Sequence, residues 1–210
     1  NFLKKIPSRK FNPLLINNFI KFNKMNSNIS NNLPEKFLIK HNIIILAGGN
    51  ISQKEKKKIK ELSNKKNYYI LSINLNKEIN EKFIDMFVFS HPLRIQSQLN
   101  LVKTTNCKIV YPFSFLNRKL NNLNSSIKKN LFNFGLTIKN SNQISITKNS
   151  CNLPEPLGVG YAISLCIAKG SKNIYMVGAN NLKSKEKFDN SSILINKMKK
   201  KYTSVNFKSL

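Results

Sequence analysis

Hydrophobic and polar positions divide the middle of the chain into buried strands and amphipathic helices. Residues 43–47 are apolar without interruption, which predicts a parallel strand buried on both faces. A polar and charged stretch follows. Ser52, with Glu55 three residues later, has the spacing of a capping box, so we expect a helix from there to about Lys65.

The same alternation continues toward the end of the chain. Further strands are expected at residues 68–74, 84–90, 107–112, 173–178 and 202–207. Helical spacing predicts helices at residues 95–102, 158–169 and 189–201. Strands that alternate with helices favour a doubly wound sheet.

A different pattern interrupts this order. Residues 135–138 and 143–147 alternate with period two around the polar residues 140–142, which predicts a β-hairpin inserted beside the main sheet. The predicted fold is therefore α/β and Rossmann-like: a doubly wound, mostly parallel sheet with a small inserted hairpin.

Two regions differ in composition. Residues 1–40 are rich in Lys and Asn and form a predicted helical lead-in, with an amphipathic helix after Pro13 and a linker at 23–34. Residues 41–210 form the predicted α/β domain. Because the chain lacks an initiator Met and stops after an apolar alternation, we expect both ends to be cuts within a longer protein.

Polar residues follow the first strand at the point where a doubly wound sheet binds its ligands. Gly48 and Gly49 would let the backbone approach a phosphate, and Asn50 and Ser52 would add hydrogen bonds. The motif is neither GxGxxG nor a P-loop. The alternative is an ordinary tight turn between strand and helix.

Other predicted strands also end in polar residues. Asn74 ends one strand and is a candidate partner for a base, ribose or sugar, or simply a turn residue. Ser90 and His91 end the next strand, and Arg94 follows; its guanidinium would pair with a phosphate or carboxylate. His91 is either an acid or base group or a surface loop residue.

Two later segments complete the predicted pocket or flank it. Gly178 and Asn180 follow the strand at residues 173–178 and belong to the predicted ligand-binding set. Glu155 lies in a Pro- and Gly-rich loop that precedes a helix, a further candidate anion contact or only a helix-start carboxylate. The spacing supports no Ser-His-Asp arrangement.

The net charge of +27 suggests a nucleic-acid partner, but the composition argues against one. The chain has 33 lysines and only three arginines, and it is also rich in Asn, Ile and Phe. Codons rich in A and T produce that bias without selection for a basic surface. Arginine, which makes the bidentate contacts of nucleic-acid sites, is nearly absent. Nucleic acid is therefore an unfavoured partner, whereas the charge suits an anionic small molecule.

Three cysteines and two histidines show no metal-ligand spacing, so we expect no metal site. The distant cysteines suggest a reducing, cytoplasmic setting. No apolar run approaches the roughly 20 residues that cross a bilayer.

The strand ends resemble a known family. Residues 45–52, 73–74, 85–94 and 158–182 are similar to the C-terminal Rossmann-like domain of 4-hydroxy-2-oxovalerate aldolase-like proteins of surface-polysaccharide synthesis. They also resemble the motility accessory factor and bacterial sialyltransferase group, whose members bind a nucleotide sugar at an equivalent glycine turn. The resemblance covers about residues 40–210 and departs from the family at Asn180 and Asn181, where an acidic residue is usual.

The resemblance implies two functions. In the first, the chain is a nucleotide- or anionic-metabolite-binding fragment of an aldolase-type lyase; the metal-binding barrel is missing, so the fragment needs no cofactor and a divalent metal is expected only in that barrel. In the alternative, the chain is a glycosyltransferase that uses a nucleotide sugar, with His91 as its general base or acid. A basic nucleic-acid-binding protein is the third and least favoured possibility.

Overall fold

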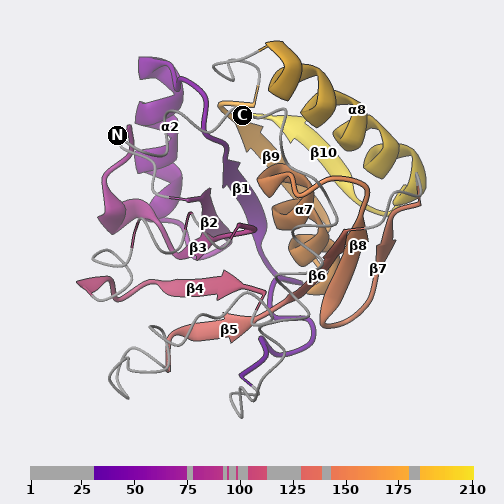
Figure 1. Ribbon diagram of the computed structural model, residues 1–210. Helices are drawn as coiled ribbons and strands as arrows, with labels where there is room; N and C mark the ends of the chain where they lie inside the picture. The colour runs from indigo at the N-terminus through magenta and orange to yellow at the C-terminus, as the bar shows by residue number, and fades with distance from the viewer. Residues whose placement is uncertain are drawn as a thin grey trace.

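A computed structural model shows the arrangement of the chain (Figure 1). It describes residues 31–74, 78–91, 94, 98, 104–112, 129–138, 143–179 and 185–210, with the side chains of 185–189 left aside. The elements are β1 (Asn42–Leu46), α2 (Gln53–Ser63), β2 (Tyr68–Ile73), the short 3-10 helix η3 (Glu81–Phe83), β3 (Met86–Val88), β4 (Lys108–Tyr111), β5 (Leu131–Asn133), β6 (Gly135–Ile138), β7 (Ser145–Ile146), β8 (Ser150–Leu153), α7 (Gly158–Ala168), β9 (Asn173–Val177), α8 (Lys185–Lys201) and β10 (Asn206–Ser209).

The main sheet has seven parallel strands in the order β10-β9-β1-β2-β3-β4-β5. β1 lies between β2 and β9, and Ile44 is in register with Ile70 on one side and Tyr175 on the other. The uninterrupted apolar run of β1 fits this central place because helices cover both of its faces. The predicted α/β, doubly wound fold is confirmed.

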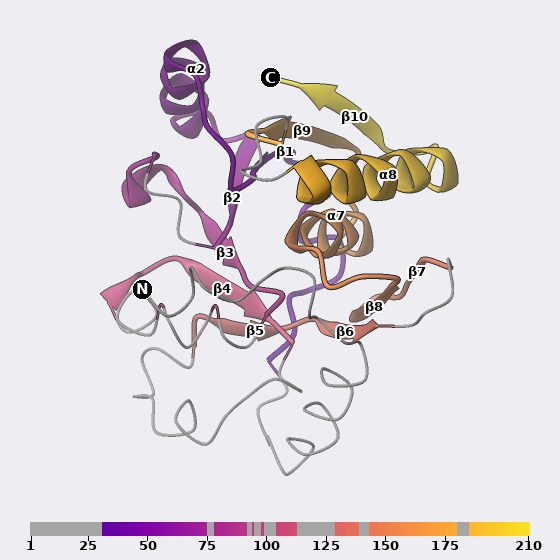
Figure 2. The same ribbon diagram turned by 45° about the horizontal axis from the view of Figure 1, so that its top comes forward.

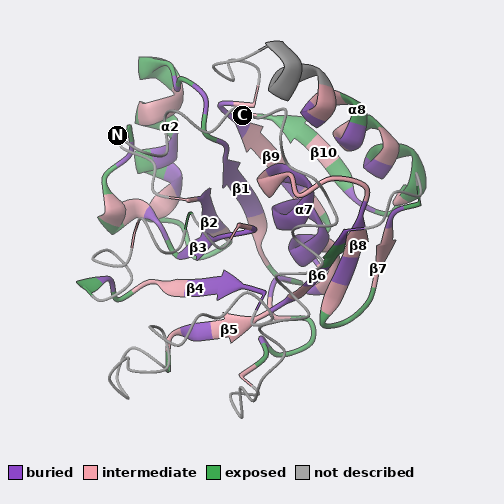
Figure 3. Cartoon of the chain, in the orientation of Figure 1, coloured by how far each residue is buried: buried purple, intermediate pink, exposed green. Residues whose placement is uncertain are grey.

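Successive residues of β1 point into two separate cores. Ile43 and Ile45 belong to the cluster formed with α7, α8 and the small sheet, whereas Ile44 and Leu46 belong to the cluster formed with α2. Figure 2 shows α2 on one side of the sheet and α7 with α8 on the other. Burial is densest in the central strands and in α7 (Figure 3).

The small sheet differs from the predicted hairpin. β6 and β7 do not pair with each other; β8 lies between them, parallel to β6 and antiparallel to β7. The hairpin prediction was wrong because it paired neighbours in sequence and missed the strand at Ser150–Leu153. β5 was also missed, and the last strand begins at Asn206 rather than at Tyr202.

Residues 31–41 are packed against the domain. Leu33 and Leu38 are 2 % and 0 % exposed, and the Nζ of buried Lys169 donates to the carbonyl of Leu33 at 2.8 Å and to that of Lys148 at 2.8 Å. Burial lowers the pKa of Lys169, and neutral acceptors satisfy its ammonium group. The helix predicted after Pro13 lies outside the described residues, as does nearly all of the one predicted at 95–102.

Candidate functional site

The carboxyl ends of the parallel strands bring most of the predicted site residues to one edge of the sheet. From β1, the strands β2 to β5 follow one another toward one edge of the sheet, whereas β9 and β10 lie on the other side of β1. The strand order therefore reverses beside β1. Ligands of doubly wound folds bind at such a reversal. Gly48 and Gly49 follow β1, Asn74 follows β2, Ser90 follows β3, and Gly178 follows β9. Asn180 lies outside the described residues.

The turn after β1 is closed by its neighbour after β9. The N–H of Gly49 donates to the carbonyl of Gly178 at 3.1 Å. Gly178 has a φ of +68°, and a Cβ there would lie 3.0 Å from the carbonyl oxygen of Gly49. The N–H of Gly49 is thus already bonded within the fold. Gly48 is exposed, and no atom lies within 4 Å of the position its Cβ would take.

The start of α2 is occupied by its own side chains. The carboxylate of Glu55 accepts from the N–H of Ser52 at 2.8 Å and from its hydroxyl at 2.7 Å, and the N–H of Glu55 donates to the Ser52 hydroxyl at 3.3 Å. The predicted capping box is therefore present. It leaves a carboxylate where the dipole of α2 would otherwise attract an anion. Asn50 is exposed beside this start.

Asn74 shapes the end of β2. Its φ is +61°, a left-handed conformation that asparagine adopts more readily than most residues. The N–H of Asn74 donates to the carbonyl of Val88 at 3.0 Å, and its carbonyl accepts from the Ser72 hydroxyl at 2.8 Å. Its backbone thereby joins the ends of β2 and β3, while its side chain is half-buried at the same edge.

The start of α7 lies against the same strand ends and is open. Its N-cap residue, Leu157, makes no side-chain capping bond. The N–H groups of Gly158, Val159 and Gly160 have no hydrogen-bond partner among the described residues. Unbonded N–H groups at a helix start form a favourable place for an anion.

Ser90 points at this open helix start. Ser90 is 6 % exposed, and its Oγ lies 3.6 Å from the position that a Cβ on Gly158 would take. Within the described ranges the Ser90 hydroxyl has no hydrogen-bond partner. A Cβ on Gly158 would also lie 2.6 Å from Cγ2 of Ile73, so glycine lets α7 begin directly against β2. A buried serine therefore lies beside a helix start whose first three N–H groups are unbonded.

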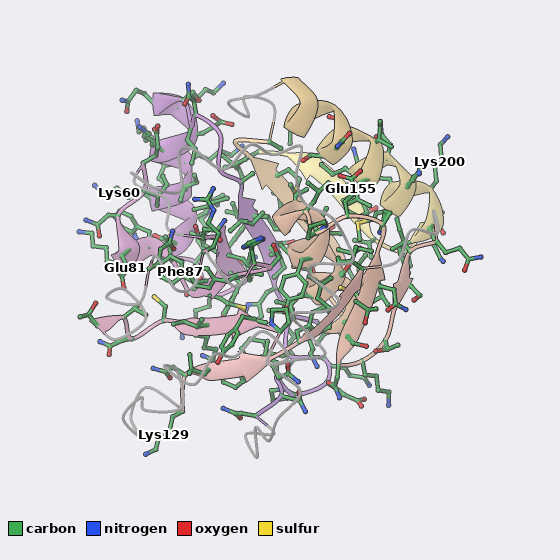
Figure 4. The ribbon with its side chains drawn as sticks, in the orientation of Figure 1. Lys60, Glu81, Phe87, Lys129, Glu155 and Lys200 are labelled. Carbon is green, nitrogen blue, oxygen red and sulfur yellow. The ribbon has the colours of Figure 1, made fainter. Side chains whose placement is uncertain are left out.

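Glu155 belongs to the loop that leads into α7 and is not part of the helix's first turn. Its Oε2 accepts from the side-chain amide of Asn190 in α8 at 3.1 Å. Figure 4 shows Glu155 near α8. This carboxylate ties the loop to α8 and makes no capping bond to α7.

His91 and Arg94 follow Ser90. Burial lowers the pKa of His91 to about 4, with a smaller contribution from the charge of Arg94, so the imidazole is neutral at pH 7. The N–H of Arg94 donates to the carbonyl of His91 at 3.1 Å, and the Arg94 side chain is exposed. His91 is thus a proton acceptor of low basicity rather than an acid.

Neither a metal centre nor a reactive thiol is found in the part of the chain that the structure describes. No three His, Cys, Asp or Glu side chains gather to hold a metal ion. Burial raises the pKa of the Cys151 thiol to about 12 and that of Cys166 further, so both thiols stay protonated. Each described helix is too short or too polar to cross a membrane.

Sequence reasoning named the loop before α7 as a candidate anion contact but did not include Gly158 and Gly160 in the predicted ligand-binding set. Their signal was an apolar residue, Leu157, at the N-cap position, where a capping side chain is usual. Comparison of the chain with family models, curated proteins and solved structures found no match in any of the three. The family resemblance therefore stays an expectation.

Proposed function

We propose that this domain binds an anionic metabolite, with its phosphate or carboxylate group at the start of α7. The observation that carries the proposal is the meeting of unbonded first-turn N–H groups with the buried hydroxyl of Ser90. Each would donate to the same anion. A helix N-terminus adds the positive end of its dipole.

Position and charge support the same conclusion. The start of α7 lies at the carboxyl edge of the sheet, beside the ends of β2 and β3, where doubly wound folds bind their ligands. The chain's net charge of +27 attracts anions over longer distances. The open surface at Gly48 leaves room at this edge for the rest of a nucleotide or nucleotide sugar.

The parent activity that we propose is an aldolase-type lyase of cell-surface carbohydrate metabolism, in which this domain binds and does not catalyse. A glycosyltransferase is the alternative, and His91 would then be its general base. A neutral imidazole supports a proton-accepting role, although a pKa of about 4 makes it a weak base. Steady release of nucleotide from a nucleotide sugar, lost in His91→Ala, would favour the transferase.

Two serines at the same edge test the proposal. Isothermal titration with pyrophosphate and with nucleotide sugars should give an affinity that Ser90→Ala weakens about tenfold, the loss of one hydrogen bond to a charged group. Ser52→Ala should leave the affinity within about twofold, because the Ser52 hydroxyl is bonded to Glu55. The reverse result would move the anion to α2, and the absence of binding by any probe would dismiss the proposal.

A further inference from the structure

A second concave surface lies on the other face of the sheet, between α2 and η3. Its volume is about 320 Å³, which is near the lower end for small-molecule sites. α2 contributes Gln53, Lys56, Lys57 and Lys60 to its wall, which are spaced at i, i+3, i+4 and i+7. This spacing places them in one stripe along the helix. Figure 4 shows Lys60 on the outer side of α2 and Glu81 on η3 nearby.

The groove carries excess positive charge. Among its lining residues three are lysines and one, Glu78, is acidic. Lys56 and Glu78 form an ion pair of 2.7 Å across the groove. Lys57 and Lys60 form no ion pair with any described residue. Two ammonium groups one helical turn apart are therefore available to the same anion.

The opposite wall supplies apolar surface and an amide. Ile79 is 7 % exposed and Phe83 is half-buried. The Oδ1 of Asn80 accepts from the N–H of Lys82 at 3.1 Å, and no described residue accepts a hydrogen bond from the Asn80 amide nitrogen, which is a donor. A ligand with one charged end and one apolar part would match these two walls.

We propose that this groove is a binding site for a small phosphate-bearing molecule with an aromatic or apolar group. Lys57 and Lys60 bind the phosphates, while Ile79 and Phe83 contact the apolar part. The site is separate from the start of α7, because the sheet lies between the two. The groove contains a carboxylate and apolar side chains, which suit a small molecule better than an extended polyanion. A polyanion would also contact Lys54 and Lys58, which lie outside the groove.

A lysine footprint tests this site directly on the whole chain. The protein is acetylated with an amine-reactive ester, with and without adenosine 5′-diphosphate, and mass spectrometry gives the rate at each lysine. Adenosine 5′-diphosphate should slow acetylation of Lys57 and Lys60 several-fold and leave Lys54 and Lys58 unchanged. Pyrophosphate should protect the same two lysines at higher concentration, because it lacks the group that contacts Phe83.

Charge reversal supplies the matched control. Lys57→Glu with Lys60→Glu should raise the nucleotide concentration that protects Lys56, the remaining lysine of the groove, at least about tenfold. Lys54→Glu with Lys58→Glu changes the net charge equally and should alter that concentration less than about twofold. Equal loss in both double variants, or no protection at all, would overturn the proposal. So would an oligothymidylate that binds more tightly than the nucleotide and protects all four lysines, because it would show a nucleic-acid-binding face.

Discussion

The starts of α2 and α7 differ in one respect that decides what each can bind. A glycine-containing turn precedes α2, and a proline-containing loop precedes α7. Both helix starts lie at the carboxyl edge of the sheet. At α2, the side chains of Ser52 and Glu55 satisfy the first turn and leave a carboxylate there. At α7, the Leu157 side chain makes no capping bond, and the first N–H groups are unbonded beside Ser90.

The comparison teaches that a glycine turn before a helix is weak evidence for a phosphate site. The turn at Gly48 and Gly49 has the composition expected of a phosphate site. However, the N–H of Gly49 donates to the carbonyl of Gly178, and Ser52 and Glu55 cap the start of α2. The start of α7 lacks a glycine turn of this kind, yet its first N–H groups have no partner among the described residues. Anion binding depends on which helix start lacks its own acceptors.

The largest expected effect is at the closed turn. Gly178→Ala places a methyl group 3.0 Å from the carbonyl oxygen of Gly49 at a φ of +68°, so the free energy of unfolding should fall by about 2–4 kcal/mol in urea titrations. Gly48→Ala is the control and should change it by less than about 0.5 kcal/mol, because its Cβ meets no atom. Equal effects would refute the closed turn.

The free energy of unfolding should depend on pH through His91, which follows Ser90. Its folded pKa of about 4 lies below the ordinary value of 6.5, so the unfolded state takes up the proton first. Its stabilising contribution is complete above pH 6.5 and is lost as the pH falls toward 4, by roughly 2 kcal/mol after allowance for partial exposure. Unfolding of wild type and His91→Gln, measured without ligand from pH 7 to 4, should therefore converge. A constant difference would contradict this burial.

A capping residue at α7 should close the open start. Leu157→Asp supplies an acceptor to the first turn, and phosphate affinity measured by calorimetry should fall at least about tenfold. Stability should change by less than about 1 kcal/mol, because the cap offsets the lost contact of a half-buried leucine. Leu157→Ala removes the same contact without adding an acceptor. If it lost affinity equally, packing rather than capping would control the site.

The smallest effect is expected at the capped start. Glu55→Ala should lower the free energy of unfolding by about 0.5–1 kcal/mol through loss of the capping box, with anion affinity unchanged. Glu61, which is exposed on the same helix, provides the control substitution, Glu61→Ala. Thermal unfolding at matched ionic strength compares the two. Weaker anion binding in Glu55→Ala alone would contradict the assignment of the site to α7.

The fold was largely predictable because its central strands are apolar on both faces. Residues 43–47 form an apolar run, and residues 68–73 are apolar except for Ser72; their burial on both faces of a parallel sheet follows from that pattern. β5 and β8 have only three and four residues and carry no such run. The pairing of β6 with β8 joins strands that are not neighbours in sequence, so local periodicity could not predict it.

The site was predictable only as a list of residues at one edge. Parallel strands explain why Asn74, Ser90 and Gly178 gather there. Sequence could not show that Gly49 donates to Gly178, or that a Cβ on Gly158 would lie 3.6 Å from the Ser90 hydroxyl, because both depend on long-range packing. The local signals at α7 were the Pro- and Gly-rich loop that precedes it and the apolar residue at its N-cap.

Amide resonances of the two helix starts test the central claim most directly. In a titration of ¹⁵N-labelled protein with inorganic phosphate, the backbone N–H signals of Gly158 and Val159 should shift saturably, and Ser90→Ala should weaken that response. The signals of Ser52 and Glu55 should not move, because their N–H groups are bonded within the capping box. Saturable shifts at Ser52 and Glu55, with Gly158 and Val159 unmoved, would contradict the account.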